Sequence, residues 1–132
     1  MQSVNPKPIL NTSLPAQFRQ IRIELAREAG HPEGDTGFAY VIVAPLDADD
    51  RIDPKLWRAH REACRIDRMR PDQDDQHGHL VRSSEGWAFS YPDVPDEVGY
   101  HFADERFVFG EYVSINEDGK MHTYRVVSVT HL

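Results

Sequence analysis

The sequence predicts an α+β fold that is mainly antiparallel β, built as a small barrel or strongly bent sheet of about six strands with one helix. Three observations predict it: short runs in which apolar and polar residues alternate, two glycine-containing turn signals, and one helix pattern with a well-marked start. A chain of 132 residues, 39% of them hydrophobic, suits a single domain. We expect an irregular N-terminal arm over 1–17 and one β-rich domain over 18–132.

The first element, at 18–28, fits two periods. Ile21, Ile23 and Leu25 alternate with polar or small residues, which favours a half-buried strand. The spacing of three and four between Phe18, Ile21 and Leu25 also fits a helix. We favour the strand, because a helix would place Ile23 on its wet side, but the sequence leaves both open.

The next segments contain a strand and the helix. The run at 38–44 is nearly continuous, β-branched and aromatic, as in a central strand buried on both faces. Asp53 before Pro54 then provides an N-cap and a proline at the first helical position. An apolar stripe at spacings of three and four follows, so we predict a helix at about 54–66. The acidic run at 72–76 predicts a solvated loop.

The last hairpin turns at 116–119, where Asn-Glu-Asp-Gly fits a type I turn followed by a left-handed glycine. That loop sets Glu111 opposite Arg125. A two-residue Asp-Gly loop would instead set Glu111 opposite Val126. We prefer the first register, because the second leaves a carboxylate beside an apolar partner.

The segment 83–86 repeats this turn chemistry and sets His79 opposite Tyr91. Between the two hairpins, 92–105 is rich in proline and acidic residues. We expect a long surface loop there with a short strand at 99–102.

Glu111 and Arg125 are the leading candidate site residues. In the preferred register they sit side by side on a largely apolar face, where the guanidinium would keep donors free for an acidic ligand. Tyr91 and His79 complete the candidate ligand-binding set. A carboxylate neutralised by an arginine is a poor general acid, so we expect a non-enzymatic module that binds a small acidic ligand or a protein partner, with no assigned catalytic residue.

Two alternatives stay open. The chain is an enzyme if Glu111 acts as acid or base, or if His77 and His79, which would share one face of an extended segment, hold a metal. The cupins, a family of metal-binding β proteins, place a Glu soon after such a pair, but Glu85 falls in a turn, so we predict no metal and no cofactor. The other alternative is a structural homodimer formed through an uncovered edge strand.

Composition bears on the remaining partners. Fifteen Lys plus Arg against twenty-two Asp plus Glu give a net charge of −7, which disfavours nucleic acid and anionic membranes. The basic helix segment at 51–70 is flanked by aspartates, which favours a solvated or internally paired face. Cys64 is the one cysteine, so a reducing cytoplasm is expected. The sequence contains no apolar run of about 20 residues that would span a membrane.

The stretches Phe18–Gly34, Gly78–Arg82 and Phe109–Val129 resemble a family of small uncharacterised bacterial proteins. The resemblance covers most of the chain and implies a bacterial origin. It implies no activity, cofactor or site residue.

Overall fold

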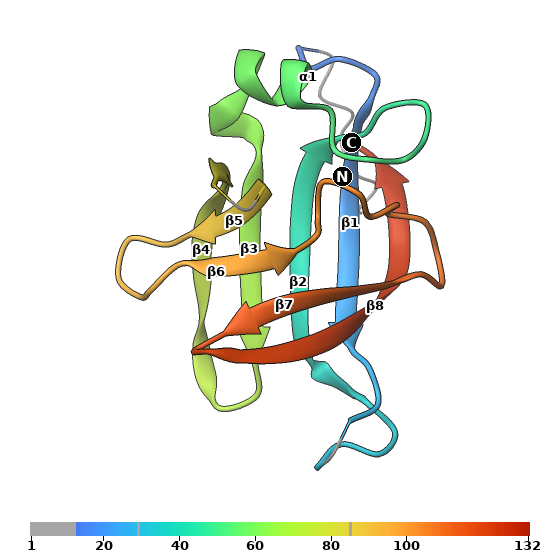
Figure 1. Ribbon diagram of the computed structural model, residues 1–132. Coiled ribbons are helices and arrows are strands. Elements are labelled where there is room, and N and C mark those ends of the chain that lie inside the picture. The colour runs from blue at the N-terminus through green and yellow to red at the C-terminus, as the bar shows by residue number, and fades with distance from the viewer. Residues whose placement is uncertain (1–12, 29, 85) are drawn as a thin grey trace, which may run out of the picture.

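The computed structural model describes residues 13–28, 30–84 and 86–132, which form a closed barrel of antiparallel strands (Figure 1). Consecutive strands are hydrogen-bonded neighbours, and the last strand pairs with the first to close the barrel. The sequence predicted a small barrel or a strongly bent sheet, and the structure confirms the mainly antiparallel barrel with one short helix, but it has eight strands rather than about six. The elements are β1 (Phe18–Leu25), β2 (Asp35–Pro45), α1 (Pro54–Ala59), a 3-10 turn (Arg61–Ala63), β3 (Arg65–Arg70), β4 (Gln73–Ser83), β5 (Gly86–Ser90), β6 (Glu97–Tyr100), β7 (Tyr112–Glu117) and β8 (Lys120–His131).

The ambiguous first segment is a strand. In β1 the side chains of Ile21, Ile23 and Leu25 are buried in the barrel, while the residues between them are partly exposed. Pairing with β2 on one side and β8 on the other fixes this alternation. The run predicted as a strand at 38–44 lies within β2. Tyr40, Ile42 and Ala44 are buried while Val41 and Val43 between them are partly exposed, so the prediction of burial on both faces was wrong.

The helix begins as predicted but ends early. The Asp53 carboxylate accepts hydrogen bonds from the backbone N–H groups of Lys55 and Leu56 at 2.9 and 3.2 Å. The prediction of a helix to about 66 was wrong, because α1 stops at Ala59 and β3 occupies 65–70. The apolar pattern predicted too long a helix because β3 does not show the alternation of a strand. One of its inward positions holds a charged residue, Arg68, rather than an apolar one.

The strand missed from the sequence is β3, and the short strand expected between the hairpins is β6. β3 forms a hairpin with β4, which begins at Gln73, so the solvated loop predicted at 72–76 is mostly strand. β6 occupies 97–100 rather than the expected 99–102. Both strands carry charged inward side chains, which conceal the alternation that identifies a strand.

The register expected for the last hairpin was wrong. Asp118 and Gly119 have φ angles of 52° and 80°, as a two-residue type I′ turn requires, and Glu117 pairs with Lys120. Because both φ angles are positive, the twist of the turn matches the twist of the two strands. This match outweighs the unfavourable placement of the Glu111 carboxylate beside an apolar residue. The β4–β5 hairpin differs from its expected register in the same way, since His79 pairs with Ser90.

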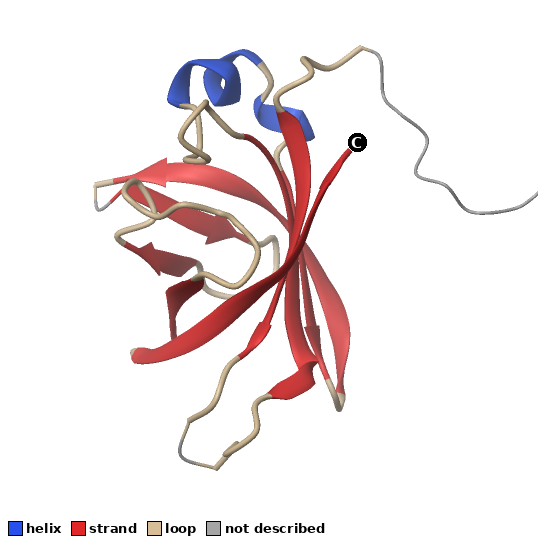
Figure 2. Ribbon diagram, turned by 90° about the vertical axis from the view of Figure 1, so that its right-hand side faces the viewer, coloured by secondary structure: helices blue, strands red, loops and turns tan. Residues whose placement is uncertain are grey.

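Aromatic side chains fill the middle of the barrel. Phe102 and Phe107, from the irregular segment between β6 and β7, are completely buried and contact each other edge to face with ring centroids 5.2 Å apart. α1 covers one end of the barrel, and the β3–β4 and β7–β8 turns lie toward the opposite end (Figures 1 and 2). The largest fully buried aromatic side chains are Trp87, Tyr40, Tyr124, Phe18, Phe89, Phe102 and Phe107.

Each strand of the described barrel has two hydrogen-bonded neighbours, and the homodimer expected from the sequence stays a prediction. The predicted N-terminal arm falls at 1–17, and its first part, 1–12, lies outside the described residues. Within the described residues, no helix has the length and apolar content needed to cross a membrane.

Gly78 is required by close packing. A Cβ atom at this position would lie 2.2 Å from the Ser90 carbonyl oxygen and 2.7 Å from Cδ1 of Tyr91. We expect Gly78→Ala to lower the free energy of unfolding by about 1–3 kcal/mol, because the backbone of β5 must move. The matched control is Gly37→Ala, whose new methyl group would come no closer than 3.0 Å to its nearest neighbour, Cγ of Pro71. Urea denaturation of both variants tests this, and an equal loss in the two would contradict it.

Candidate functional site

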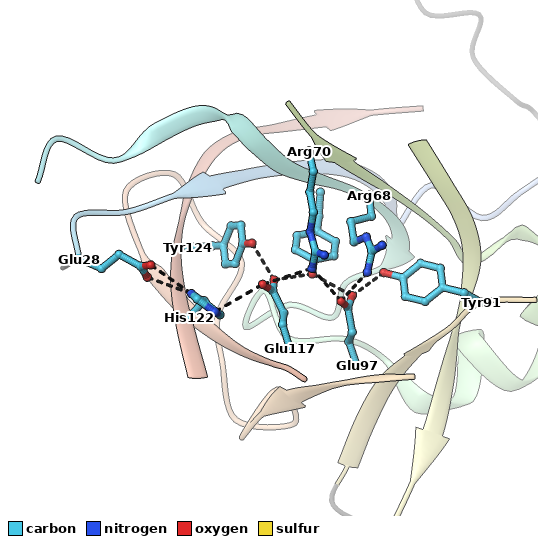
Figure 3. Close-up of polar contacts among 9 residues, drawn as sticks. Glu28, Arg68, Arg70, Tyr91, Glu97, Glu117, His122 and Tyr124 are labelled. Carbon is cyan, nitrogen blue, oxygen red and sulfur yellow. Dashed lines mark hydrogen bonds and ion pairs between the residues drawn. The ribbon is translucent and has the colours of Figure 1, made fainter. Parts of the chain in front are cut away.

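A cluster of charged and phenolic side chains lies inside the barrel, toward the end opposite α1 (Figure 3). We call it the polar cluster. It brings together residues from β2, β3, β6, β7 and β8 and one residue that follows β5. Its members are Tyr40, Arg68, Arg70, Tyr91, Glu97, Glu117 and Tyr124.

Glu97 is the centre of the polar cluster, and it is 4% exposed. Its Oε2 accepts hydrogen bonds from Nη1 of Arg68 at 2.8 Å and from Nη2 of Arg70 at 3.2 Å. Its Oε1 accepts one from the Tyr91 hydroxyl at 2.8 Å. A carboxylate removed from water in this way is tolerated because two cations and a phenol replace its hydration.

Glu117 is held in a similar way at the end of β7. Its Oε2 accepts a hydrogen bond from the Tyr124 hydroxyl at 2.7 Å, and its Oε1 lies 3.4 Å from Nη2 of Arg70. Arg70 therefore bridges the two carboxylates, as Figure 3 shows. The two arginines and two glutamates of the cluster balance in formal charge.

The Tyr40 hydroxyl lies between the two carboxylates. Its oxygen is 2.8 Å from Oε1 of Glu97 and 2.6 Å from Oε2 of Glu117. A phenol carries one hydrogen and can donate to one carboxylate at a time. At any moment the hydroxyl therefore donates to either Glu97 or Glu117, and the other carboxylate oxygen lies beside the phenol oxygen. The Tyr40 hydroxyl thus ties the two carboxylates together inside the barrel.

The tyrosine hydroxyls of the cluster stay protonated well into alkaline conditions. Burial, and then the Glu117 carboxylate, raise the pKa of Tyr40 far above its ordinary value. Burial and the adjacent carboxylate of Glu97 raise the pKa of Tyr91, and burial and Glu117 do the same for Tyr124. The three phenols therefore act as hydrogen-bond donors near neutral pH, which keeps the carboxylates paired.

One side of the polar cluster opens into a cleft of about 370 Å³, which we call the mouth cleft. Arg70, Glu117 and Tyr124 reach it from the cluster. His122 and Glu28 add a second pair, in which Nδ1 of His122 lies 3.2 Å from both carboxylate oxygens of Glu28. The other ring nitrogen of His122 lies 3.8 Å from Oε1 of Glu117, so the imidazole stands between two carboxylates (Figure 3).

The structure separates the four ligand-binding residues predicted from the sequence. Glu111 and Arg125 do not face each other, because Tyr112 pairs with Arg125. Both side chains are exposed, and the Arg125 guanidinium lies over the Phe109 ring, 5.3 Å from its centroid. The expectation of a desolvated pair was therefore wrong, because it depended on the other hairpin register.

Arg125 lines a different cleft, of about 430 Å³, beside β1 and β8. His79 lies on the outer side of β4, exposed, and lines a third cleft near α1. Of the four predicted residues, Tyr91 alone belongs to the polar cluster.

The histidines considered as metal ligands are not gathered into a larger set. His77 and His79 are exposed on β4, and Nδ1 of His77 lies 2.6 Å from a carboxylate oxygen of Asp67. Across the described residues, no group of three or more His, Cys, Asp or Glu side chains is placed to hold a metal ion. Cys64 is buried, and burial raises the pKa of its thiol to about 12, so it is not a reactive thiolate near neutral pH.

Sequence reasoning missed Arg68, Arg70, Glu97 and Glu117. The two arginines sat in the segment expected to end the helix, and Glu97 sat in the expected loop. The available signal was the spacing of Arg68 and Arg70, which share one face of a strand. This spacing identifies a site only when it is known that carboxylates lie opposite the two arginines inside the barrel.

Comparisons of the chain with protein-family models, with curated proteins and with solved structures gave no match. The site is therefore interpreted from its own geometry.

The ion pairs of the polar cluster predict a large effect of Glu97→Ala. Removing this carboxylate leaves Arg68, 7% exposed, without its buried partner, so we expect the free energy of unfolding to fall by about 3–5 kcal/mol. Glu111→Ala is the control and should cost less than about 0.5 kcal/mol, because that side chain is exposed. Chemical denaturation compares the two, and a small loss in Glu97→Ala would contradict the burial of the pair.

The phenols predict a specific loss of stability at alkaline pH. In the unfolded chain a tyrosine ionises near pH 10, whereas the raised pKa keeps Tyr40, Tyr91 and Tyr124 protonated in the fold. The contribution of these three hydroxyls to the free energy of unfolding is fully present below about pH 10. It is lost as the pH rises further, at up to about 1.4 kcal/mol per pH unit for each group. Denaturation across this range should show the decline, and Tyr124→Phe should make it shallower. An unchanged slope in that variant would count against the assignment.

Proposed function

We propose that the protein is a non-enzymatic binding module for a small organic acid that also carries a hydroxyl or amino group. The ligand lies in the mouth cleft, with Arg70 as the residue that accepts its carboxylate. The observation that carries this proposal is the position of Arg70, which is fixed by two buried carboxylates and still reaches the cleft.

The contacts of Arg70 support its role as the residue that accepts the carboxylate of the ligand. Nη2 is the guanidinium atom that contacts Glu97 and Glu117. Among the described residues, no hydrogen bond or ion pair occupies Nη1 or Nε of Arg70. A guanidinium held rigidly with free donors is suited to a carboxylate, because little entropy is lost on binding. Lys120 and His122 add further donors at the same cleft.

The carboxylates of the mouth cleft support the presence of a hydroxyl or amino group on the ligand. Glu28 and Glu117 line it together with Arg70, so a bare anion would meet repulsion as well as attraction. A ligand with a hydroxyl or amino group can donate to these oxygens while its own carboxylate faces the guanidinium. The volume, about 370 Å³, is within the range typical of small-molecule sites.

A second candidate function is acid–base catalysis on the same class of ligand. The observation that favours it is His122, whose ring is oriented by Glu28 and directed at Glu117. We place binding first because the groups of the polar cluster already satisfy one another, and because none of them is shown to contact a reacting atom. In this second case His122 replaces the earlier candidates Glu111, His77 and His79.

Thermal denaturation with L-malate and L-glutamate as probes tests the proposal. A probe present at 100 times its dissociation constant should stabilise the fold by about 2.7 kcal/mol. The dimethyl ester of each probe should be ineffective, because it offers no carboxylate to Arg70. Proton NMR of the incubated probe then separates the two candidates, since a binding module leaves the probe unchanged and an enzyme converts it.

Arg70→Lys should weaken binding about tenfold, because the ammonium keeps the charge but loses the planar donors. Lys120→Gln, at the exposed turn, is a second test of the same cleft, because it removes a donor without disturbing the polar cluster. The matched control is Arg27→Lys, which changes an arginine of the cleft beside β1. Equal binding of acid and ester, or equal losses in Arg27→Lys and Arg70→Lys, would exclude the mouth cleft as the site.

A further inference from the structure

The third cleft, which His79 lines, has a volume of about 660 Å³ and lies at the α1 end of the barrel, between α1 and the last residues of β4. We call it the arginine–tryptophan cleft. Trp57, Leu80 and Val81 supply its apolar lining. Its cationic side chains are Arg58, Arg61 and Arg82.

Two arginines of this cleft are stacked on indole rings. The guanidinium of Arg61 lies over Trp57 at 4.8 Å, and that of Arg82 lies over Trp87 at 4.6 Å. The two indoles contact each other edge to face at 5.2 Å, and Trp57 is fixed by a hydrogen bond from Nε1 to the Leu80 carbonyl oxygen at 2.8 Å. Stacking on a fixed ring restricts each guanidinium in advance of binding.

The cationic groups are available for an external anion. Arg58, Arg61 and Arg82 are exposed, and no ion pair joins them to a carboxylate within residues 13–28, 30–84 and 86–132. Glu62 is the carboxylate among the lining residues, so the cleft keeps a formal excess of two positive charges. This excess stands out in a chain whose net charge is −7.

We propose that the arginine–tryptophan cleft docks an acidic peptide segment of a partner protein, with one apolar side chain of that segment packed on Val81 beside Trp57. The cations stand on two separate elements, α1 with its following turn and β4, which suits several carboxylates along a chain better than one small anion. Arginine clusters recognise acidic motifs in this way, and tryptophan and arginine are the residue types that most often dominate binding energy at interfaces. The proposal does not depend on a ligand in the mouth cleft.

Intrinsic fluorescence provides a direct test, because the chain has two tryptophans, of which Trp57 lines this cleft and Trp87 contacts Trp57 beneath the guanidinium of Arg82. The probe is a short acetylated peptide of glutamates around one phenylalanine, titrated into the full-length protein. We expect tryptophan emission to shift with saturation and the affinity to fall as salt is added. A peptide with glutamine in place of glutamate should bind weakly, and so should one with alanine in place of phenylalanine.

Arg58→Gln and Arg82→Gln should each weaken the peptide about fivefold, which corresponds to an exposed ion pair of about 1 kcal/mol. Arg58 does not stack on an indole, so its variant tests charge without disturbing the tryptophans. Arg27→Gln and Arg125→Gln, in the cleft beside β1 and β8, are the matched controls and should bind as the parent does.

Three results would overturn the proposal: no emission change with the acidic peptide, equal binding of the glutamine peptide, or equal losses in the control variants. Inorganic phosphate that displaces the peptide at low millimolar concentration would also overturn it, because the cleft would then be a site for small anions.

Discussion

Glu97 is surrounded inside the barrel by two guanidinium groups and a phenol, and the closure of the barrel depends on this neutralisation. Arg68 and Arg70 come from β3, while Glu97 begins β6, so the contacts join two strands that are not neighbours in the sheet. An unpaired charge in this position would cost several kcal/mol. Each of these strands can direct charged residues inward only because the other supplies the opposite charge.

The same arrangement prepares the mouth cleft. Arg70 is fixed by Glu97 and Glu117, so it lines the cleft without the entropy cost that a free arginine side chain would carry on binding. The phenols of Tyr40 and Tyr124 hold the Glu117 carboxylate from the other side. A site of this kind gains selectivity from rigid donors and acceptors, since a ligand that lacks a matching group leaves one of them unpaired.

The aromatic interior divides the barrel into two ends with different chemistry. At one end the polar cluster opens into the mouth cleft, where cations and carboxylates alternate. At the other end α1 brings arginines and tryptophans together above an apolar lining. Phe89, Phe102 and Phe107 are fully buried in the barrel core. Substitutions in the two clefts should therefore act independently on stability, as expected for sites without shared partners.

The sequence by itself determined the mainly antiparallel β class and the N-cap at Asp53, and it favoured a strand for β1, because these depend on local periodicity and on hydrogen bonds between near neighbours. It could not determine β3, the bounds of β6 or the polar cluster. Their inward side chains are charged, and a charged side chain faces inward only when a distant strand offers its counter-charge. The register of the β7–β8 hairpin was also decided by the tertiary structure, because the twist of the closed barrel favours a type I′ turn at Asp118 and Gly119. Local patterns carry no information about partners that are far apart along the chain, so the site became visible only when the barrel brought those partners together.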